Sequence, residues 1–274
     1  MNISLIYLSL SSFSNSPQFS FSNSNKPNLL DFSKITTKYY FSQFLFLSSD
    51  AVNCSIRESA FQNYLNVALK IQENVYVPRY FPNFNPKLIR SEYYNDLVET
   101  AITEQRNSVL NIFSCLFQSC VSTTLAGAIE FIHISGQLTV DTCSFDMCSS
   151  KQCAAIYFLG KQSNSSEPNT GGTYAISSII TNCCFMNCSG TNDGVVCKIV
   201  SNTASINNTY AVGCYNVNGT SGNFGFLMYV QRFSSEYFNI TDSNMKAMSS
   251  VYIKNAKPAA VKFHTNVGHT STII

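Results

Sequence analysis

A short motif, C-x-F-x-x-C, occurs three times and constrains the fold more than any other feature of the chain. It reads CLFQSC at 115–120, CSFDMC at 143–148 and CCFMNC at 183–188. The second step between copies is longer than the first, and the loop-like stretch KQSNSSEPNTGGT at 161–173 accounts for the difference. We expect Cys214 to be a degenerate fourth copy. A motif that recurs in this way is typical of repeat proteins, in which each repeat is one structural unit.

An apolar segment with strand-like alternation follows each motif, and two more such segments come later in the chain. The segments are GAIEFI at 127–132, AAIYFL at 154–159, VVCKIV at 195–200, FLMYV at 226–230 and SVYIK at 250–254. Within each segment we align one triplet, such as Ile129-Glu130-Phe131. Alternation puts the first and third residues of the triplet on one face of the strand and the middle residue on the other. The outward residues are expected to form one column: Glu130, Tyr157, Lys198, Tyr229 and Tyr252.

One coil of about 28 residues with two or three short strands is the signature of a parallel β-helix. The chain is therefore expected to be all-β, a solenoid with an N-terminal capping or irregular segment. Residues 50–110 hold 13 charged side chains, whereas 111–230 hold 8. On this basis we divide the chain into a signal-like or disordered lead-in (1–35), a cap or divergent first coils (36–110), the β-helix repeats (111–260) and a polar tail (261–274).

The same segments resemble the repeat of the polymorphic outer membrane proteins, which are bacterial autotransporter adhesins, and of related protist surface families. That repeat reads G-[AG]-[AI] followed by F-x-x-N. The first half is similar to Gly127-Ala128-Ile129, to Ala154-Ala155-Ile156 and more loosely to Gly194-Val195-Val196. The second half is similar to Phe117–Cys120, Phe145–Cys148 and Phe185–Cys188, with Cys replacing Asn throughout. The resemblance covers about 110–230 and implies a right-handed β-helix with a surface or adhesive role.

Equivalent positions of successive coils stack in a β-helix, so the motif predicts three columns. These are Cys115, Cys143 and Cys183; Cys120, Cys148 and Cys188; and Phe117, Phe145 and Phe185. Buried packing is the first interpretation, because Cys behaves as a small hydrophobe and Phe buries a large area. Disulfides remain an alternative, either within a column or between Cys148 and Cys153. Zinc is a third, although C-x4-C is not the usual zinc spacing.

Composition narrows the classes of partner and the compartment. The net charge is +2, with 17 Lys plus Arg and 15 Asp plus Glu, which favours neither nucleic acid nor an acidic ligand. Eleven cysteines, together with sequons at Asn2, Asn53, Asn164, Asn187, Asn207, Asn218 and Asn239, indicate an extracellular or cell-surface glycoprotein. A cytoplasmic location stays open as the alternative. We find no run of 18 apolar residues, so no transmembrane helix is expected, and a membrane-associated chain would need another means of attachment.

Catalysis has to be weighed because β-helices also serve as polysaccharide lyases and hydrolases. Such sites need clustered carboxylates. Between 111 and 230 the acids are Glu130, Asp141, Asp146, Glu167 and Asp193. Asp141 and Asp146 flank the middle motif, but two Asp in turns are usually turn formers. We therefore expect a non-enzymatic module without cofactor or metal, which binds a glycan or protein through the column from Glu130 to Tyr252. The alternative is a carbohydrate-active enzyme in which Asp141, Asp146 and a basic residue converge.

Overall fold

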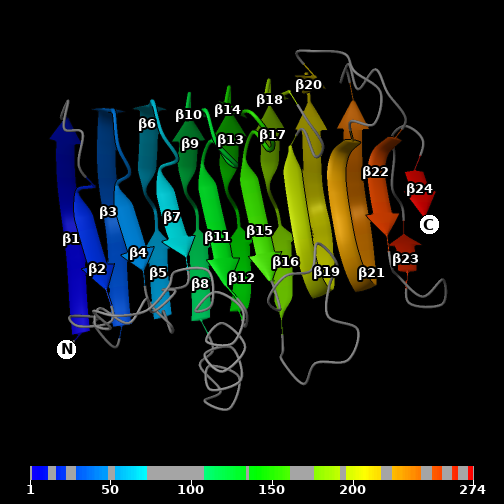
Figure 1. Ribbon diagram of the computed structural model, residues 1–274, viewed down its shortest axis with the longest axis horizontal. Helices are drawn as coiled ribbons and strands as arrows, with labels where there is room; N and C mark the ends of the chain where they lie inside the picture. The colour runs from blue at the N-terminus through cyan, green and yellow to red at the C-terminus, as the bar shows by residue number, and fades with distance from the viewer. Residues whose placement is uncertain are drawn as a thin grey trace, which may run out of the picture.

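The chain folds into a parallel β-helix, in which each coil stacks on the one before it (Figure 1). The structure, a computed structural model, describes residues 2–11, 17–22, 29–48, 53–72, 108–133, 136–160, 176–191, 196–216, 224–241, 249–254, 261–264 and 271–273. Every strand pair in these ranges is parallel, for example β12 with β8 and β16. The predicted solenoid class is confirmed.

Four ladders of strands run along the rod. Ladder I contains β1 (Asn2–Ser11), β3 (Leu29–Tyr40), β5 (Asn53–Arg57), β8 (Ser108–Phe113), β12 (Gly136–Asp141), β16 (Ser177–Thr181), β19 (Cys197–Val212), β21 (Phe224–Thr241) and β23 (Val261–His264). Ladder II contains β6 (Ala60–Tyr64), β9 (Leu116–Gln118), β13 (Ser144–Asp146), β17 (Cys184–Met186) and the later parts of β3, β19 and β21.

The remaining two ladders complete each coil. Ladder III is short and contains β10 (Val121–Ser122), β14 (Ser149–Ser150), β18 (Ser189–Gly190) and β20 (Tyr215–Asn216). Ladder IV contains β2 (Phe19–Ser22), β4 (Leu45–Ser48), β7 (Leu69–Gln72), β11 (Ile129–His133), β15 (Ile156–Gly160), the starts of β19 and β21, β22 (Ser249–Lys254) and β24 (Ser271–Ile273). Strands β19 and β21 therefore pass from ladder IV of one coil into ladders I and II of the next.

The stack extends further along the chain than the 111–260 segment that the motif marks. β1 pairs with β3, β3 pairs with β5 and β6, and β23 and β24 pair with β21 and β22. Within 36–110, the described strands are coils of this same stack, while residues 73–107 lie outside the described part. These early coils lack the cysteine motif because other residues, such as Ser59 and Tyr64, occupy its positions. A leader function for residues 1–35 stays a prediction.

Two corners in each coil are made by residues in the left-handed backbone region. The first corner, between ladders I and II, has φ of 52° at Ser114, 55° at Thr142 and 54° at Asn182. The second corner, between ladders II and III, has φ of 51° at Ser119 and 50° at Met147. Each of these residues directly precedes a cysteine of the motif. A single left-handed residue reverses the alternation of side chains, so the following cysteine points inward.

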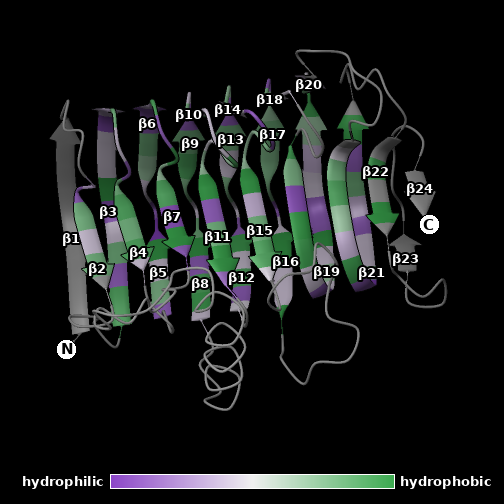
Figure 2. Ribbon diagram, viewed as in Figure 1, coloured by the Kyte–Doolittle hydropathy of each residue, from purple (hydrophilic) through white to green (hydrophobic). Residues whose placement is uncertain are grey.

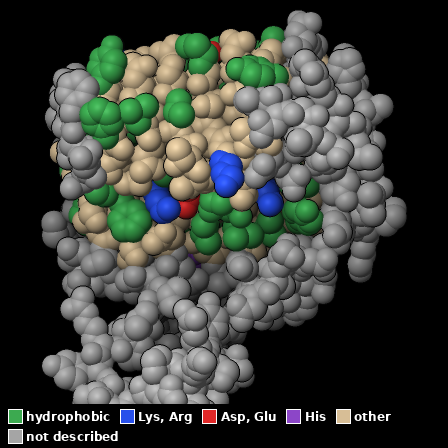
Figure 3. Space-filling model, turned by 45° about the horizontal axis from the view of Figure 1, so that its top comes forward, with side chains coloured by type: hydrophobic (Ala, Val, Ile, Leu, Met, Phe, Trp, Pro, Cys, Tyr) green, Lys and Arg blue, Asp and Glu red, His purple; other side chains and the backbone are tan. Residues whose placement is uncertain are grey.

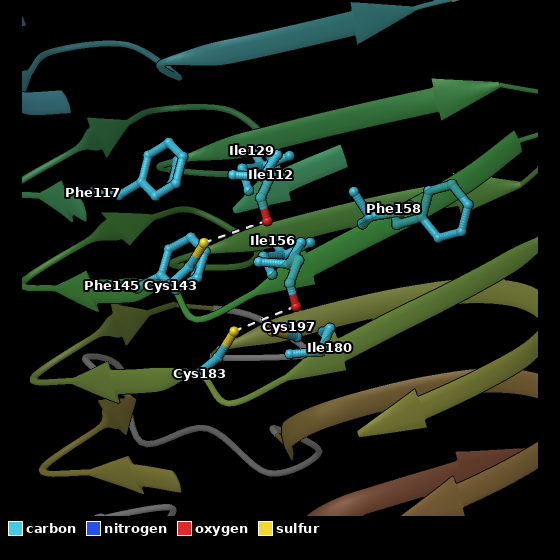
Figure 4. Close-up of a cluster of buried hydrophobic side chains, with 14 of the residues drawn as sticks. Ile112, Phe117, Ile129, Cys143, Phe145, Ile156, Phe158, Ile180, Cys183 and Cys197 are labelled. Atoms are coloured by element: carbon cyan, nitrogen blue, oxygen red, sulfur yellow. Dashed lines mark hydrogen bonds between the residues drawn. The ribbon is translucent and has the colours of Figure 1, made fainter. Parts of the chain in front are cut away.

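The interior is a continuous apolar core: hydrophobic residues recur along the ladders in Figure 2, and the rings of Phe117 and Phe145 lie one above the other in Figure 4. The ring centroids of Phe117 and Phe145 are 5.0 Å apart, those of Phe145 and Phe185 are 4.8 Å apart, and the rings are nearly parallel. Phe61 extends the column backward at 5.1 Å from Phe117. All four rings are fully buried. Large-to-small changes at such positions typically cost about 3–5 kcal/mol.

Candidate functional site

The first cysteines of the motif lie in one column at the first corner, and their thiols bond the backbone. Sγ of Cys143 donates to the carbonyl of Asp141 at 3.2 Å and to that of Ile112, in the preceding coil, at 3.6 Å (Figure 4). Cys115 and Cys183 make the equivalent contacts. The carbonyl of Asp141 also accepts the N–H of Ser114 at 3.0 Å, so the thiol is a second donor to a backbone group that is already bonded between coils.

Hydroxyl groups take the thiol's place in neighbouring coils. Ser59 Oγ donates to the carbonyl of Arg57 at 2.7 Å, and Thr209 Oγ1 donates to that of Asn207 at 2.8 Å. Both residues occupy the same corner position as Cys115, as the pairing of their neighbours shows. The position therefore requires a small hydrogen-bond donor and not a thiol as such. This exchange favours a structural role for the column.

The second cysteines form a column of their own at the second corner. Cys120, Cys148 and Cys188 each donate from Sγ to a carbonyl of the preceding coil, at 3.5 Å. Cys214 makes the same contact with the carbonyl of Phe185 at 3.6 Å. Cys214 therefore continues this second column. The expectation that Cys214 is a fourth member of the first column was wrong, because Thr209 occupies that position.

All eleven cysteines are buried as free thiols, including Cys148 and Cys153. Burial raises the pKa of the Cys54 thiol, and hydrogen bonding to Cys143 together with burial raises that of Cys183. A buried thiol with a raised pKa is a poor nucleophile. Among the described residues, no group of three or more His, Cys, Asp or Glu side chains is placed to hold a metal ion.

The structure forms the outward column predicted on ladder IV, except that Leu227 stands where Tyr229 was predicted. Glu130 pairs with Tyr157, Tyr157 with Lys198, and Lys198 with Leu227 rather than with Tyr229. Leu227 in turn pairs with Tyr252. Tyr229 lies two residues further along β21, opposite Val200. The triplet in this coil is Phe226-Leu227-Met228, so the predicted alignment of Tyr229 was wrong by one step of the alternation.

Three residues of this column are almost completely shielded from solvent. Glu130 is 2% exposed, Tyr157 8% and Leu227 1%. Glu130 Oε1 lies 2.8 Å from Nζ of Lys70, and Nζ of Lys198 lies 5.8 Å from the centre of the Tyr157 ring. Burial, with smaller effects of Cys153 and Glu130, raises the pKa of Tyr157 to about 12. Alternation predicts the direction of these side chains but not what packs over them.

Tyr157 belongs to a small second apolar cluster outside the main core. The cluster contains Val67, Ala126 and Cys153 as well, with Leu125, Ile132 and Leu159 packed against it. Gly127 stands beside it, where a Cβ atom would lie 2.4 Å from the carbonyl oxygen of Ala154 and 2.6 Å from that of Cys120. The glycine of the G-A-I segment is therefore required by the close approach of two backbones.

Asp141 and Asp146 end up on different ladders, on either side of the first corner. Asp141 closes β12 in ladder I and accepts hydrogen bonds from Asn182 Nδ2 at 2.9 Å and Thr142 Oγ1 at 3.2 Å. Asp146 closes β13 in ladder II and accepts one from Gln118 Nε2 at 3.2 Å. The two carboxylates do not share a partner, and each is bonded by a neutral neighbour. The predicted convergence with a basic residue is not formed by these contacts.

A different outward surface is both exposed and regular, and the sequence analysis missed it. We call it the polar face: the outward residues of ladder I in three successive coils, which are Ser177, Ile179 and Thr181; Thr203, Ser205 and Asn207; and Arg232, Ser234 and Glu236. Tyr237 lies at the adjoining first corner, and Tyr210 lies just past that corner, at the start of ladder II. Ile179, Tyr210 and Tyr237 are 44%, 48% and 52% exposed. The alternate Ser, Thr and Asn in 177–181 and 203–207 were the available signal.

Hydrogen bonds between coils hold the polar face in place. Ser234 Oγ donates to Ser205 Oγ at 3.1 Å, and Asn207 Nδ2 donates to the same Ser205 Oγ at 2.9 Å. The backbone N–H of Glu236 donates to Asn207 Oδ1 at 3.1 Å. These bonds fix the orientation of the side chains before any partner arrives, which lowers the entropic cost of binding.

Comparison with known proteins adds no assignment to this geometry. Among the described residues, no helix is long and apolar enough to cross a membrane. No protein-family model, no curated protein and no solved structure matches the chain.

Proposed function

We propose that the chain is a non-catalytic β-helical binding module, secreted or displayed at the cell surface, which holds a glycan on its polar face. The observation that carries the proposal is the set of side chains that are already hydrogen-bonded to one another around Ser205. Half-exposed Tyr210 and Tyr237 flank this set. Hydroxyl and amide groups on a rigid sheet offer the donors and acceptors that sugar hydroxyls need, and Tyr rings offer flat amphipathic area at little entropic cost.

The sparse charge of the polar face favours a neutral ligand. Arg232 and Glu236 are its two charged members, one of each sign, and they lie in the same coil. A face built for a polyanion would carry several cations, because affinity for such ligands comes from charge neutralisation. A neutral polysaccharide or the neutral part of a glycoprotein glycan fits the residues better.

Two further features support the proposal. The sequon residue Asn53 is exposed, so a glycosyltransferase of the secretory pathway could reach it in a folded coil. Asp141 and Asp146, the acids on which the enzyme alternative depends, stand on different ladders and are each bonded by a neutral side chain.

A glycan array followed by titration with the selected glycan tests the proposal. The test variant carries Ile179→Ser, Tyr210→Ser and Tyr237→Asn, where Asn is chosen because Tyr237 has φ of 51° and Asn tolerates that region. We expect affinity to fall by about tenfold or more, since recognition surfaces concentrate their energy in a few such residues.

The matched control carries three substitutions of exposed apolar residues elsewhere, Tyr39→Asn, Phe41→Ser and Leu65→Ser, and should bind as the wild type does. Absence of glycan binding by the wild type, or unchanged affinity in the folded test variant, would reject the polar face as the site.

A further inference from the structure

Six of the nine large apolar side chains that are exposed in the described residues lie along one edge of the rod. We call this line the apolar edge: Tyr39 (54% exposed), Phe41 (42%), Leu65 (58%), Val121 (38%), Met147 (47%) and Tyr215 (44%). The other three are Ile179 of the polar face and Tyr210 and Tyr237 beside it. Figure 3, in which the top of Figure 1 comes forward, shows hydrophobic side chains set among uncharged atoms there. Single exposed apolar residues are ordinary, but a line of them on one edge needs an explanation.

Register places these residues at the second corner or just after it, in every coil from Tyr39 to Tyr215 except that of Cys188, where Asn187 and Ser189 occupy the two positions. Leu65 donates its N–H to the carbonyl of Tyr40 at 2.8 Å, which sets Leu65 beside Phe41. Val121 follows through the pairing of Gln62 with Gln118, and ladder III then continues from Val121 through Ser149 and Ser189 to Tyr215. Tyr39 and Met147 occupy the corner itself, with φ of 61° and 50°. At about 4.8 Å per coil, the line runs for roughly 24 Å along the rod.

Charge is almost absent from this edge. From each second-corner residue to the end of ladder III in that coil, the described residues include no charged side chain, and the exposed Lys151 directly follows β14. The neighbouring outward column of ladder II adds exposed Lys38 and the carboxylate of Asp146, which Gln118 bonds. An anionic or zwitterionic surface can therefore approach without facing an unbonded carboxylate.

We propose that the apolar edge is a site for the interfacial region of a lipid bilayer, on which the rod lies lengthwise as a peripheral protein. Six half-exposed side chains offer about 500 Å² of apolar area in a single line, less than the ~800 Å² per partner of a stable protein interface. A line on a convex corner also lacks the flat complementary face that a second copy would need. Such a line can enter a fluid interface, where Tyr and Phe are at home and lysines meet the headgroups.

This inference does not depend on the glycan proposal, because it concerns another surface. Co-sedimentation with vesicles of phosphatidylcholine, with and without phosphatidylserine, measures it directly. The edge variant (Tyr39→Asn, Phe41→Ser, Leu65→Ser) should lose about tenfold or more in partitioning, since binding scales with the apolar area inserted. The polar-face variant (Ile179→Ser, Tyr210→Ser, Tyr237→Asn) loses a similar exposed area elsewhere and should partition as the wild type does.

A second measurement locates the contact. The chain has no tryptophan, so Leu65→Trp introduces one emitter on the edge and Ile179→Trp one on the polar face. Vesicles should shift the Leu65→Trp emission to the blue, and brominated lipids should quench it, while Ile179→Trp stays unchanged. The proposal is overturned by a wild type that does not sediment with vesicles or by an edge variant that partitions equally. Self-association that is lost in the edge variant, without lipid binding, would assign the edge to a protein contact instead.

Discussion

The backbone N–H of Cys115 donates a hydrogen bond to Sγ of Cys143, one coil further along the chain, with the two atoms 3.4 Å apart. The same relationship joins Cys183 N–H to Thr209 Oγ1 at 3.4 Å and Ile35 N–H to Ser59 Oγ at 3.1 Å. Each corner side chain therefore accepts a bond from one coil while its own hydrogen bonds a carbonyl nearby. Cysteine at this position connects neighbouring coils without a covalent link.

This relationship predicts that Cys143→Ser is tolerated and Cys143→Ala is not. Serine keeps the donor and the acceptor, as Ser59 already does in an earlier coil. Alanine leaves a buried N–H and carbonyl with poorer partners, which typically costs about 1–2 kcal/mol. Urea unfolding followed by circular dichroism measures both variants, and equal losses would show that the sulfur contributes by packing alone.

The phenylalanine column predicts a graded response at Phe145. Phe145→Leu should lose about 1–1.5 kcal/mol, because it keeps most of the buried volume. Phe145→Ala should lose about 3–5 kcal/mol, and Phe145→Asp should prevent folding by burying an unpaired charge. Chemical denaturation gives the first two values. A Phe145→Asp protein that is soluble with the wild-type circular dichroism spectrum contradicts the packing described here.

Tyr157 predicts a loss of stability at alkaline pH. Its pKa is raised from 10.0 to about 12 by burial. Above pH 10 the unfolded chain loses the phenolic proton while the folded chain retains it, so unfolding is favoured as pH rises. The stabilisation is complete below pH 10 and is lost by about pH 12, a difference of roughly 3 kcal/mol. Tyr157→Phe should lose less stability than the wild type between pH 9 and pH 12, whereas parallel curves would show that the buried thiols dominate.

The ion pair on ladder IV predicts that Glu130→Gln destabilises the rod even in salt. Glu130 is almost fully buried, and Nζ of Lys70 is its charged partner at 2.8 Å. Neutralising the acid leaves a partly buried ammonium group uncompensated, at a cost of about 2 kcal/mol that salt screens little. Lys70→Met combined with Glu130→Gln should recover most of the loss, and a double-mutant cycle measures the coupling.

The spacing of the cysteine motif was enough to predict a parallel solenoid, because only stacked coils bring Phe117, Phe145 and Phe185 to equivalent positions. The early coils were predicted as one of two alternatives, a cap or divergent first coils, since Ser59, Tyr64 and their neighbours serve the same corners without a cysteine. In the early coils the structural role of the corner positions recurs, but the type of residue that fills them does not.

The outward surface was harder to predict than the interior. In Phe226-Leu227-Met228-Tyr229-Val230 the alternation continues without a break. Two alignments that differ by two residues therefore fit equally well, one with Leu227 in the outward column and one with Tyr229. Pairing with β19 decides between them and selects Leu227. Burial of Glu130 and Tyr157 depends on what packs over the strand, which a period of two does not encode.

The spacing of the phenylalanine column also bears on how the rod assembles. Phe117 stacks on Phe145 ahead of it and on Phe61 behind it, and the chain that separates Phe117 from Phe61 is twice as long. Closing a loop of twice the length costs about 0.6 kcal/mol more, and it is also slower. Before Phe61 and after Phe117, contacts between coils close shorter loops, such as the one that pairs Thr37 with Phe61. Two stacks should therefore nucleate separately, one before residue 73 and one after residue 107, and their docking should set the slowest phase of refolding.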